Sequence, residues 1–179
     1  GNLDETMAMV NSQSPSGLFY RAADLREAAT KARLRKDWPA AKNAAEEARK
    51  IIKQILISNP DHVPWLTELS ESHYELGSVL YHGMRDPSSA GEVFSEWTKT
   101  AEHLMQLEPA NPKWIAQARN SHAWRANIAD ALGDNASAIK ERGLELALQQ
   151  KLPTPTEEDP SGWRSMAFAH YRLALAMRN

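Results

Sequence analysis

The chain of 179 residues is 42% hydrophobic and 25% charged, the composition of a soluble globular domain of ordinary size. It contains no cysteine, which excludes disulfides, thiolate metal sites and thiol catalysis. No apolar run approaches the roughly 18–20 residues that span a bilayer, so no direct membrane insertion is expected. The chain opens Gly-Asn-Leu without an initiator Met, and we expect it to be part of a longer protein.

The net charge of −2 is unevenly distributed. Residues 1–60 carry 10 basic against 7 acidic residues, residues 61–112 carry 2 against 9, and residues 113–179 carry 9 against 7. A nucleic-acid-binding surface would need a continuous basic stripe, so no nucleic-acid partner is expected. The acidic middle either attracts its basic neighbours in a stacked array or forms a functional acidic patch, and both readings stay open.

The expected elements are all helices. Residues 1–17 are polar and rich in turn formers, so we expect a flexible arm there. Apolar residues then recur at spacings of three and four from Leu18 to Ala32, which predicts the first helix. Asp37-Trp38-Pro39 predicts the start of the second, with Asp37 as its N-cap. By the same signals we expect further helices at about 64–84, 87–108, 112–132, 135–150 and 161–178.

A long repeat organises these helices. Trp65, Trp114 and Trp163 follow one another at intervals of 49 residues, and a histidine stands seven or eight residues after each, at 73, 122 and 170. Such a period is typical of stacked antiparallel helix pairs, which cannot bury their apolar faces alone. The predicted fold is therefore all-α with about seven helices, in units of about 18–60, 61–109 and 110–157 followed by a C-terminal helix over 161–179.

Small residues recur within a unit. Leu76-Gly77 lies on the first helix, Ala90 and Phe94 lie on the second, and Pro109 closes the unit. This pattern resembles the tetratricopeptide repeat, and its length of about 49 residues resembles the extended tetratricopeptide-like repeats of bacterial signalling proteins. The resemblance covers residues 18–179 and implies an α-solenoid that binds protein partners.

Repeated positions are best explained by packing. The three Trp residues occupy one structural place, so we expect them to pack on the preceding helix. The histidines lie about one repeat apart, roughly 10 Å between packed helices, whereas zinc ligand bonds are ~2 Å long. We therefore expect inter-helix hydrogen bonds and no metal site. Ser137–Lys140 matches S-x-x-K without its partner motifs, and no phosphate-binding loop is present, so no catalytic residue and no cofactor is expected.

The resemblance implies that the first helix of each unit lines a binding groove. Counting from Gly77, the implied positions are Ala23, Arg26, Thr30 and Arg33, then Glu71, Tyr74, Ser78 and Tyr81, then Asn120, Ala123, Asn127 and Asp130, and finally Phe168, Tyr171, Leu175 and Arg178. Tyr74 and Tyr81 are either exposed contacts or buried against the next unit, and the sequence leaves both open. The Lys/Asn clamp that chaperone-binding members use is not reproduced, because Tyr74 and Ser78 stand in its place.

These observations predict a non-catalytic protein–protein interaction module that binds a peptide or protein segment in its groove and belongs to a larger bacterial signalling or regulatory protein. The alternative is self-association, in which the open C-terminal end of the array pairs with a second copy to form a homodimer. Partner and compartment, cytoplasmic or periplasmic, stay open.

Overall fold

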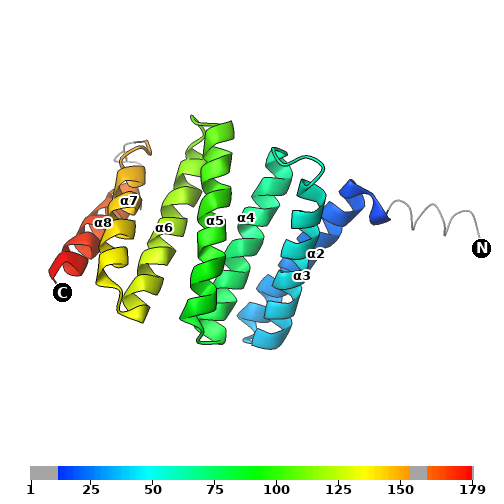
Figure 1. Cartoon of the computed structure of the whole chain (residues 1–179), viewed down its shortest axis with the longest axis horizontal. Coiled ribbons are helices and arrows are strands. Elements are labelled where there is room, and N and C mark those ends of the chain that lie inside the picture. Colours follow the sequence, from blue (N-terminus) through cyan, green and yellow to red (C-terminus); the bar gives the residue numbers. More distant parts are fainter. Residues whose placement is uncertain (1–11, 154–160, 179) are drawn as a thin grey trace, which may run out of the picture. The chain divides into compact units, whose positions relative to one another are not determined.

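The computed structural model describes residues 12–153 and 161–178, except for the side chains of 161–165. In this part of the chain there is no strand, and the all-α prediction is confirmed. The elements are α2 (Pro15–Leu34), α3 (Trp38–Leu56), α4 (Val63–Ser78), the π-helical turn η1 (Val79–Gly83), α5 (Pro87–Leu107), α6 (Pro112–Leu132), α7 (Asn135–Gln149) and α8 (Ser161–Arg178) (Figure 1). None of the described helices combines the length and apolarity needed to cross a membrane.

The chain divides into two compact units, Gly1–Asp86 and Pro87–Asn179, which we call unit one and unit two. The division falls inside the predicted repeat over 61–109, between its two helices. The structure therefore groups α2, α3, α4 and η1 in unit one, and α5 to α8 in unit two.

In unit one, α3 packs against both α2 and α4, and α2 also contacts α4. Neighbouring helices run antiparallel (Figure 1). Small side chains on α2 and α3 are buried in unit one, where Ala22, Ala29, Ala41, Ala45 and Ala48 are fully buried. Alanine at these positions allows a close approach of the two helices.

Helix starts follow local capping chemistry. The Ser14 hydroxyl accepts a hydrogen bond from the Gly17 amide at 3.1 Å, so α2 begins at Pro15 rather than at Leu18. Of the predicted flexible arm over 1–17, residues 1–11 lie outside the described residues. Asp37 caps α3 as predicted, because its carboxylate accepts from the Ala40 amide at 3.3 Å.

The predicted helix over about 64–84 is not uniform. Its α-helical part ends at Ser78 and continues as η1, where the Met84 amide donates to the Val79 carbonyl at 3.0 Å, five residues back. At Gly83 the backbone lies against the Trp38 ring, and a Cβ there would overlap that ring. The widened turn occurs where the chain passes this indole.

In unit two, α6 packs against α5 and α7, and α7 also packs against α8. Phe94 is fully buried and stacks on Trp124, with ring centroids 5.1 Å apart and an interplanar angle of 18°. Trp114 is 4% exposed and its indole donates to the Glu108 carboxylate at 2.6 Å, consistent with a packing role. Between α6 and α7, Gly133 takes the left-handed conformation at φ 74°, which glycine adopts without a Cβ clash.

Candidate functional site

Two ion pairs join the predicted groove helices of unit one. The Arg26 Nε lies 2.5 Å from Glu68 Oε1. The Arg33 Nε lies 2.9 Å from Glu75 Oε2, with a second contact of 3.4 Å from Nη2 to Oε1. The glutamate side chains are 9% and 8% exposed. Both predicted groove arginines on α2 are therefore paired with acids of α4.

The two glutamates were not among the predicted site residues. The sequence does contain a signal for them. The two arginines are seven residues apart, about two helical turns, and so are the two glutamates. Each arginine precedes its glutamate by 42 residues. Burial raises the pKa of Glu68, against the opposing effect of the Arg26 charge. The pKa of Arg26 is raised overall. Burial acts to lower it, but the hydrogen bond and the negative charge of Glu68 outweigh burial.

The remaining predicted residues of unit one differ in exposure. The Thr30 hydroxyl donates to the Arg26 carbonyl at 3.1 Å within its own helix. Ser78 is buried, at 3% exposure. Glu71, Tyr74 and Tyr81 are each half-buried, which lies between the two alternatives left open for the tyrosines.

In unit two, predicted groove residues from two helices meet at a pocket of about 330 Å³ between α6, α7 and α8. We call it the α6–α8 pocket. Asn127 and Asp130 from α6 and Leu175 from α8 are predicted groove residues that line it; the others are Asn135, Arg142, Arg172 and Ala176. Outside the pocket, Asn120 is exposed and accepts from Arg119, and Tyr171 is 62% exposed. Phe168 and Arg178 are exposed and do not line it either.

Arg142 lines the α6–α8 pocket and is 3% exposed. Its Nη2 donates to Asn127 Oδ1 at 2.7 Å and to Asp130 Oδ2 at 3.2 Å. Its Nη1 donates to Glu145 Oε2 at 3.0 Å and to the Ala123 carbonyl at 3.2 Å. The two predicted side chains of α6 are thus held by a buried cation from α7. No pattern in the sequence identified Arg142.

Arg172 is the second cation of this pocket. Its guanidinium lies over the Phe168 ring, 4.2 Å from the centroid. Burial lowers the pKa of Arg172, and the positive charge of Arg142 lowers it further. Within the described part of the chain, no carboxylate forms an ion pair with Arg172. The pocket therefore contains a cation whose charge is only partly compensated.

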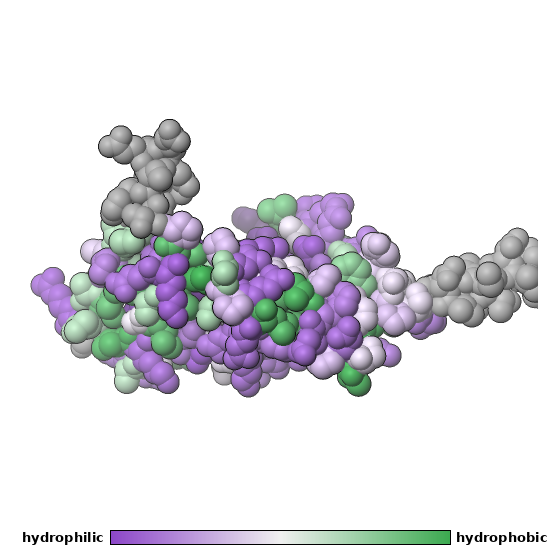
Figure 2. All heavy atoms as spheres, turned by 90° about the horizontal axis from the view of Figure 1, so that it is seen from above, coloured by the Kyte–Doolittle hydropathy of each residue, from purple (hydrophilic) through white to green (hydrophobic). Residues whose placement is uncertain are grey.

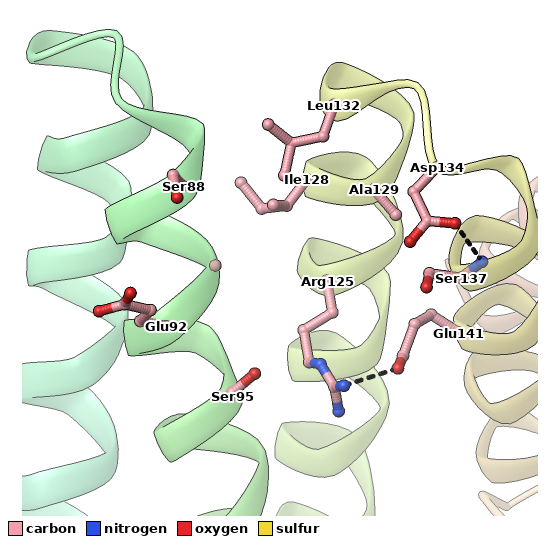
Figure 3. A pocket seen from close by; sticks show the side chains of 11 residues that line it. Ser88, Glu92, Ser95, Arg125, Ile128, Ala129, Leu132, Asp134, Ser137 and Glu141 are labelled. Carbon is pink, nitrogen blue, oxygen red and sulfur yellow. Dashed lines mark hydrogen bonds and ion pairs between the residues drawn. The ribbon is translucent and has the colours of Figure 1, made fainter.

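A second pocket lies between α5, α6 and α7, with a volume of about 340 Å³ (Figure 3). We call it the α5–α7 pocket. Its acidic lining residues are Glu92, Asp134 and Glu141, and Arg125 is its basic one. The Arg125 Nη2 lies 2.8 Å from Glu141 Oε1. The other oxygen of Glu141 lies 2.6 Å from the Nδ1 of the buried His122.

Comparison with models of known protein families gave no match, and no curated protein matched this chain.

The repeat histidines and the S-x-x-K match are the remaining residues that could carry chemistry. His122 makes the expected inter-helix hydrogen bond to Glu141, His73 is 1% exposed, and His170 is exposed. Among the described residues, no group of three or more acids and histidines is placed to hold a metal ion. At the S-x-x-K match, the Ser137 amide donates to Asp134 Oδ1 at 3.0 Å at the start of α7, and Lys140 is exposed.

Proposed function

We propose that this chain is a non-catalytic, tetratricopeptide-like interaction module. It binds a peptide or protein segment against the first helices of its helix-pair repeats. The observation that carries the proposal is the α6–α8 pocket, because three residues at expected groove positions line it: Asn127, Asp130 and Leu175. The fold class and the 49-residue register support it as well. As the resemblance implies, the chain would act within a larger bacterial signalling protein.

The charge of the α6–α8 pocket favours an acidic side chain in the bound segment. Arg142 is hydrogen-bonded to Asp130, Glu145 and Asn127, whereas Arg172 forms no ion pair with a described carboxylate and feels Glu145 and Asp130 only through their charge. A carboxylate placed beside Arg172 would offset the repulsion between the two guanidinium groups. Leu175 and Ala176 supply an apolar edge for the neighbouring part of the segment.

Selection from a displayed library of random peptides on the immobilised chain tests this function. Peptides enriched on the wild-type chain should carry Asp or Glu and should bind Arg172→Gln at least about tenfold more weakly, equivalent to about 1.4 kcal/mol. Lys140→Gln removes an equal charge from an exposed position of α7 and should leave binding within about twofold. If no peptide is enriched, or if both variants bind alike, the pocket is not the binding site.

The groove of unit one needs its own test. Tyr74→Ala combined with Tyr81→Ala removes two half-buried aromatic side chains from α4 and η1. Circular dichroism first establishes that the variant keeps its helix content. Unchanged binding of the enriched peptides by a folded double variant would remove unit one from the site.

Self-association is the second candidate function, and one observation favours it. Phe168, Tyr171 and Leu175 follow one another at spacings of three and four on α8 and are 52%, 62% and 47% exposed. Figure 2 shows hydrophobic residues at the surface of its left end, where Figure 1 places α8. Exposed apolar stripes of this kind mark interaction surfaces. A second copy pairing through α8 would cover this stripe.

Light scattering over a range of protein concentrations distinguishes the two functions. A homodimer should dissociate on dilution, and Leu175→Glu should shift it to monomer by burying a charge in the interface. A chain that stays monomeric at the highest concentration is not a dimerisation module through α8.

A further inference from the structure

The orientation of the Asn127 amide follows from the donor that contacts it. The Arg142 Nη2 makes a hydrogen bond of 2.7 Å to the end of the Asn127 side chain. A guanidinium group only donates hydrogen bonds, so the atom that accepts from it is the amide oxygen Oδ1. The amino group Nδ2 is the other arm of the amide and takes no part in this contact.

Arg142 is fixed by acceptors from two helices. Its side chain is 3% exposed, and besides Asn127 it donates to Asp130 Oδ2 and the Ala123 carbonyl, both at 3.2 Å, and to Glu145 Oε2 at 3.0 Å. A buried guanidinium with four acceptors cannot turn away from one of them without leaving a buried donor or a charge unpaired. Arg142 therefore holds the Asn127 amide in one orientation.

The Asn127 amino group is available to a ligand. Asn127 is half-buried and lines the α6–α8 pocket. Within the described part of the chain, its side chain accepts from Arg142 but its amino group donates to no protein atom. Polar groups in such places are normally satisfied by protein, water or a ligand. The amide thus offers two N–H donors to an occupant of the pocket.

Arg172 supplies a second open donor. The pocket lining holds the guanidinium groups of Arg142 and Arg172 against the single carboxylate of Asp130, and that carboxylate is already hydrogen-bonded to Arg142. No described carboxylate forms an ion pair with Arg172. An amide amino group and a guanidinium are therefore both left to donate. Such a pair suits a negatively charged acceptor with two oxygens, which is a carboxylate.

We propose that Arg142 orients the Asn127 amide so that its amino group and the Arg172 guanidinium together bind one carboxylate of the partner segment. The inference rests on the proposed function, because it names how the same pocket recognises its ligand. A neutral glutamine side chain in the ligand offers one oxygen and turns its own amino hydrogens toward a donor. The pocket should therefore discriminate against it.

NMR of the isotope-labelled chain with short blocked peptides tests the contact. Acetyl-Gly-Glu-Gly-amide carries a side-chain carboxylate, acetyl-Gly-Gly-Gly carries a C-terminal one, and acetyl-Gly-Gln-Gly-amide is the neutral control. At millimolar concentration a carboxylate probe should shift the Asn127 Nδ2 and Arg172 Nε resonances in a saturable way, and the probe that binds more tightly gives the source of the carboxylate. The neutral control should bind at least about tenfold more weakly.

Variants of Asn127 identify the donor. Asn127→Asp keeps the acceptor for Arg142 but replaces the amino group with an oxygen, so it should fold and bind the carboxylate probes at least about tenfold more weakly. Asn127→Leu should weaken them too, which separates the lost donor from the added charge. Asn120→Asp adds the same charge at an exposed position of α6 outside the pocket and should change binding by no more than about twofold.

Arg142→Lys tests the positioning role. Lysine keeps the charge, but a compact ammonium group cannot serve acceptors spread around a planar guanidinium. The preference for the glutamate probe over the glutamine probe should fall at least about fivefold, as expected when an oriented hydrogen bond is lost. A merely structural role would lower stability and leave this preference unchanged. If this variant does not fold, the Asn127 variants decide the question.

The outcomes separate this inference from the proposed function. Probe-induced shifts in the α6–α8 pocket without a shift of Asn127 Nδ2, equal binding of the glutamine probe, or unchanged binding by Asn127→Asp would overturn the inference alone. Where the short probes bind too weakly, an enriched library peptide and its Glu-to-Gln or Asp-to-Asn analogue replace them. If neither probes nor library peptides bind, the inference and the proposed function both fail.

Discussion

Arg33 on α2 and Glu75 on α4 form a two-point ion pair, with contacts of 2.9 Å and 3.4 Å between guanidinium and carboxylate. Two helical turns earlier on the same two helices, Arg26 and Glu68 repeat the arrangement. Because the glutamate side chains are nearly buried, these pairs are internal links between α2 and α4 in unit one. The pairs also explain why two acids can lie nearly buried on α4.

Arg33→Met should destabilise unit one. The Glu75 carboxylate, 8% exposed, would lose its cation while staying in a poorly solvated place. Removing one partner of a buried pair costs about 3–5 kcal/mol, and because the Arg33 side chain is 26% exposed we expect about 2 kcal/mol. Urea unfolding measures the loss, and Arg33→Met with Glu75→Met should recover part of it. A loss no larger than that of Lys31→Met, which breaks the exposed pair with Glu27, would contradict this account.

His73 should make stability fall in acid. Burial, together with the positive charges of Arg49 and Lys53, lowers its pKa from 6.5 to about 3. Above pH 6.5 the imidazole is neutral in both the folded and the unfolded state, so it contributes no pH dependence. Between pH 6.5 and about 3 the unfolded state takes up a proton that the folded state does not. The contribution of His73 to the free energy of unfolding should then fall with a slope approaching about 1.4 kcal/mol per pH unit.

The variant His73→Gln isolates this effect, because glutamine does not titrate. Urea unfolding of both chains between pH 7.5 and 5 should show a steeper decline for the wild type. Parallel pH profiles would mean that His73 takes up its proton in the folded state.

Trp114→Ala should be among the most destabilising single changes in unit two. The side chain is 4% exposed, and truncation of a buried Trp costs about 3–5 kcal/mol through lost packing and the cavity that remains. Thermal unfolding gives the difference. Trp65→Ala is the comparison, because Trp65 occupies the same repeat position but is only half-buried, so its loss should be smaller. Equal losses would show that the repeat position, and not burial, determines the cost.

Two glycines should respond oppositely to alanine. At Gly83 a methyl group would overlap the Trp38 ring, and such overpacking costs about 1–3 kcal/mol. At Gly143 on α7 an added Cβ meets nothing within 4 Å, so the better helix propensity of alanine should stabilise by up to about 1 kcal/mol. Chemical unfolding of both variants checks the signs. A stabilising Gly83→Ala would mean that the Trp38 ring moves aside freely.

Much of the fold could be predicted because helix signals are local. Asp37 caps α3 as predicted, α7 begins at the expected residue 135 with Asp134 as its cap, and Gly133 turns the chain between α6 and α7. These outcomes depend on side chains within three or four residues of the helix end. Ser14 caps α2 in the same way, so this helix begins at Pro15, inside the stretch over 1–17 that was expected to be a flexible arm.

The sequence by itself determined that the chain is helical, where most of its helices begin, and which residues share a repeat register. Only the tertiary structure decided how these residues are used. It paired Arg26 and Arg33 with glutamates 42 residues away, and it brought Arg142, from the second helix of a pair, into hydrogen-bonding contact with Asn127 and Asp130. The reason is physical: caps and periodicity act within one helix, whereas a salt bridge or a pocket depends on distances between helices that are set by packing.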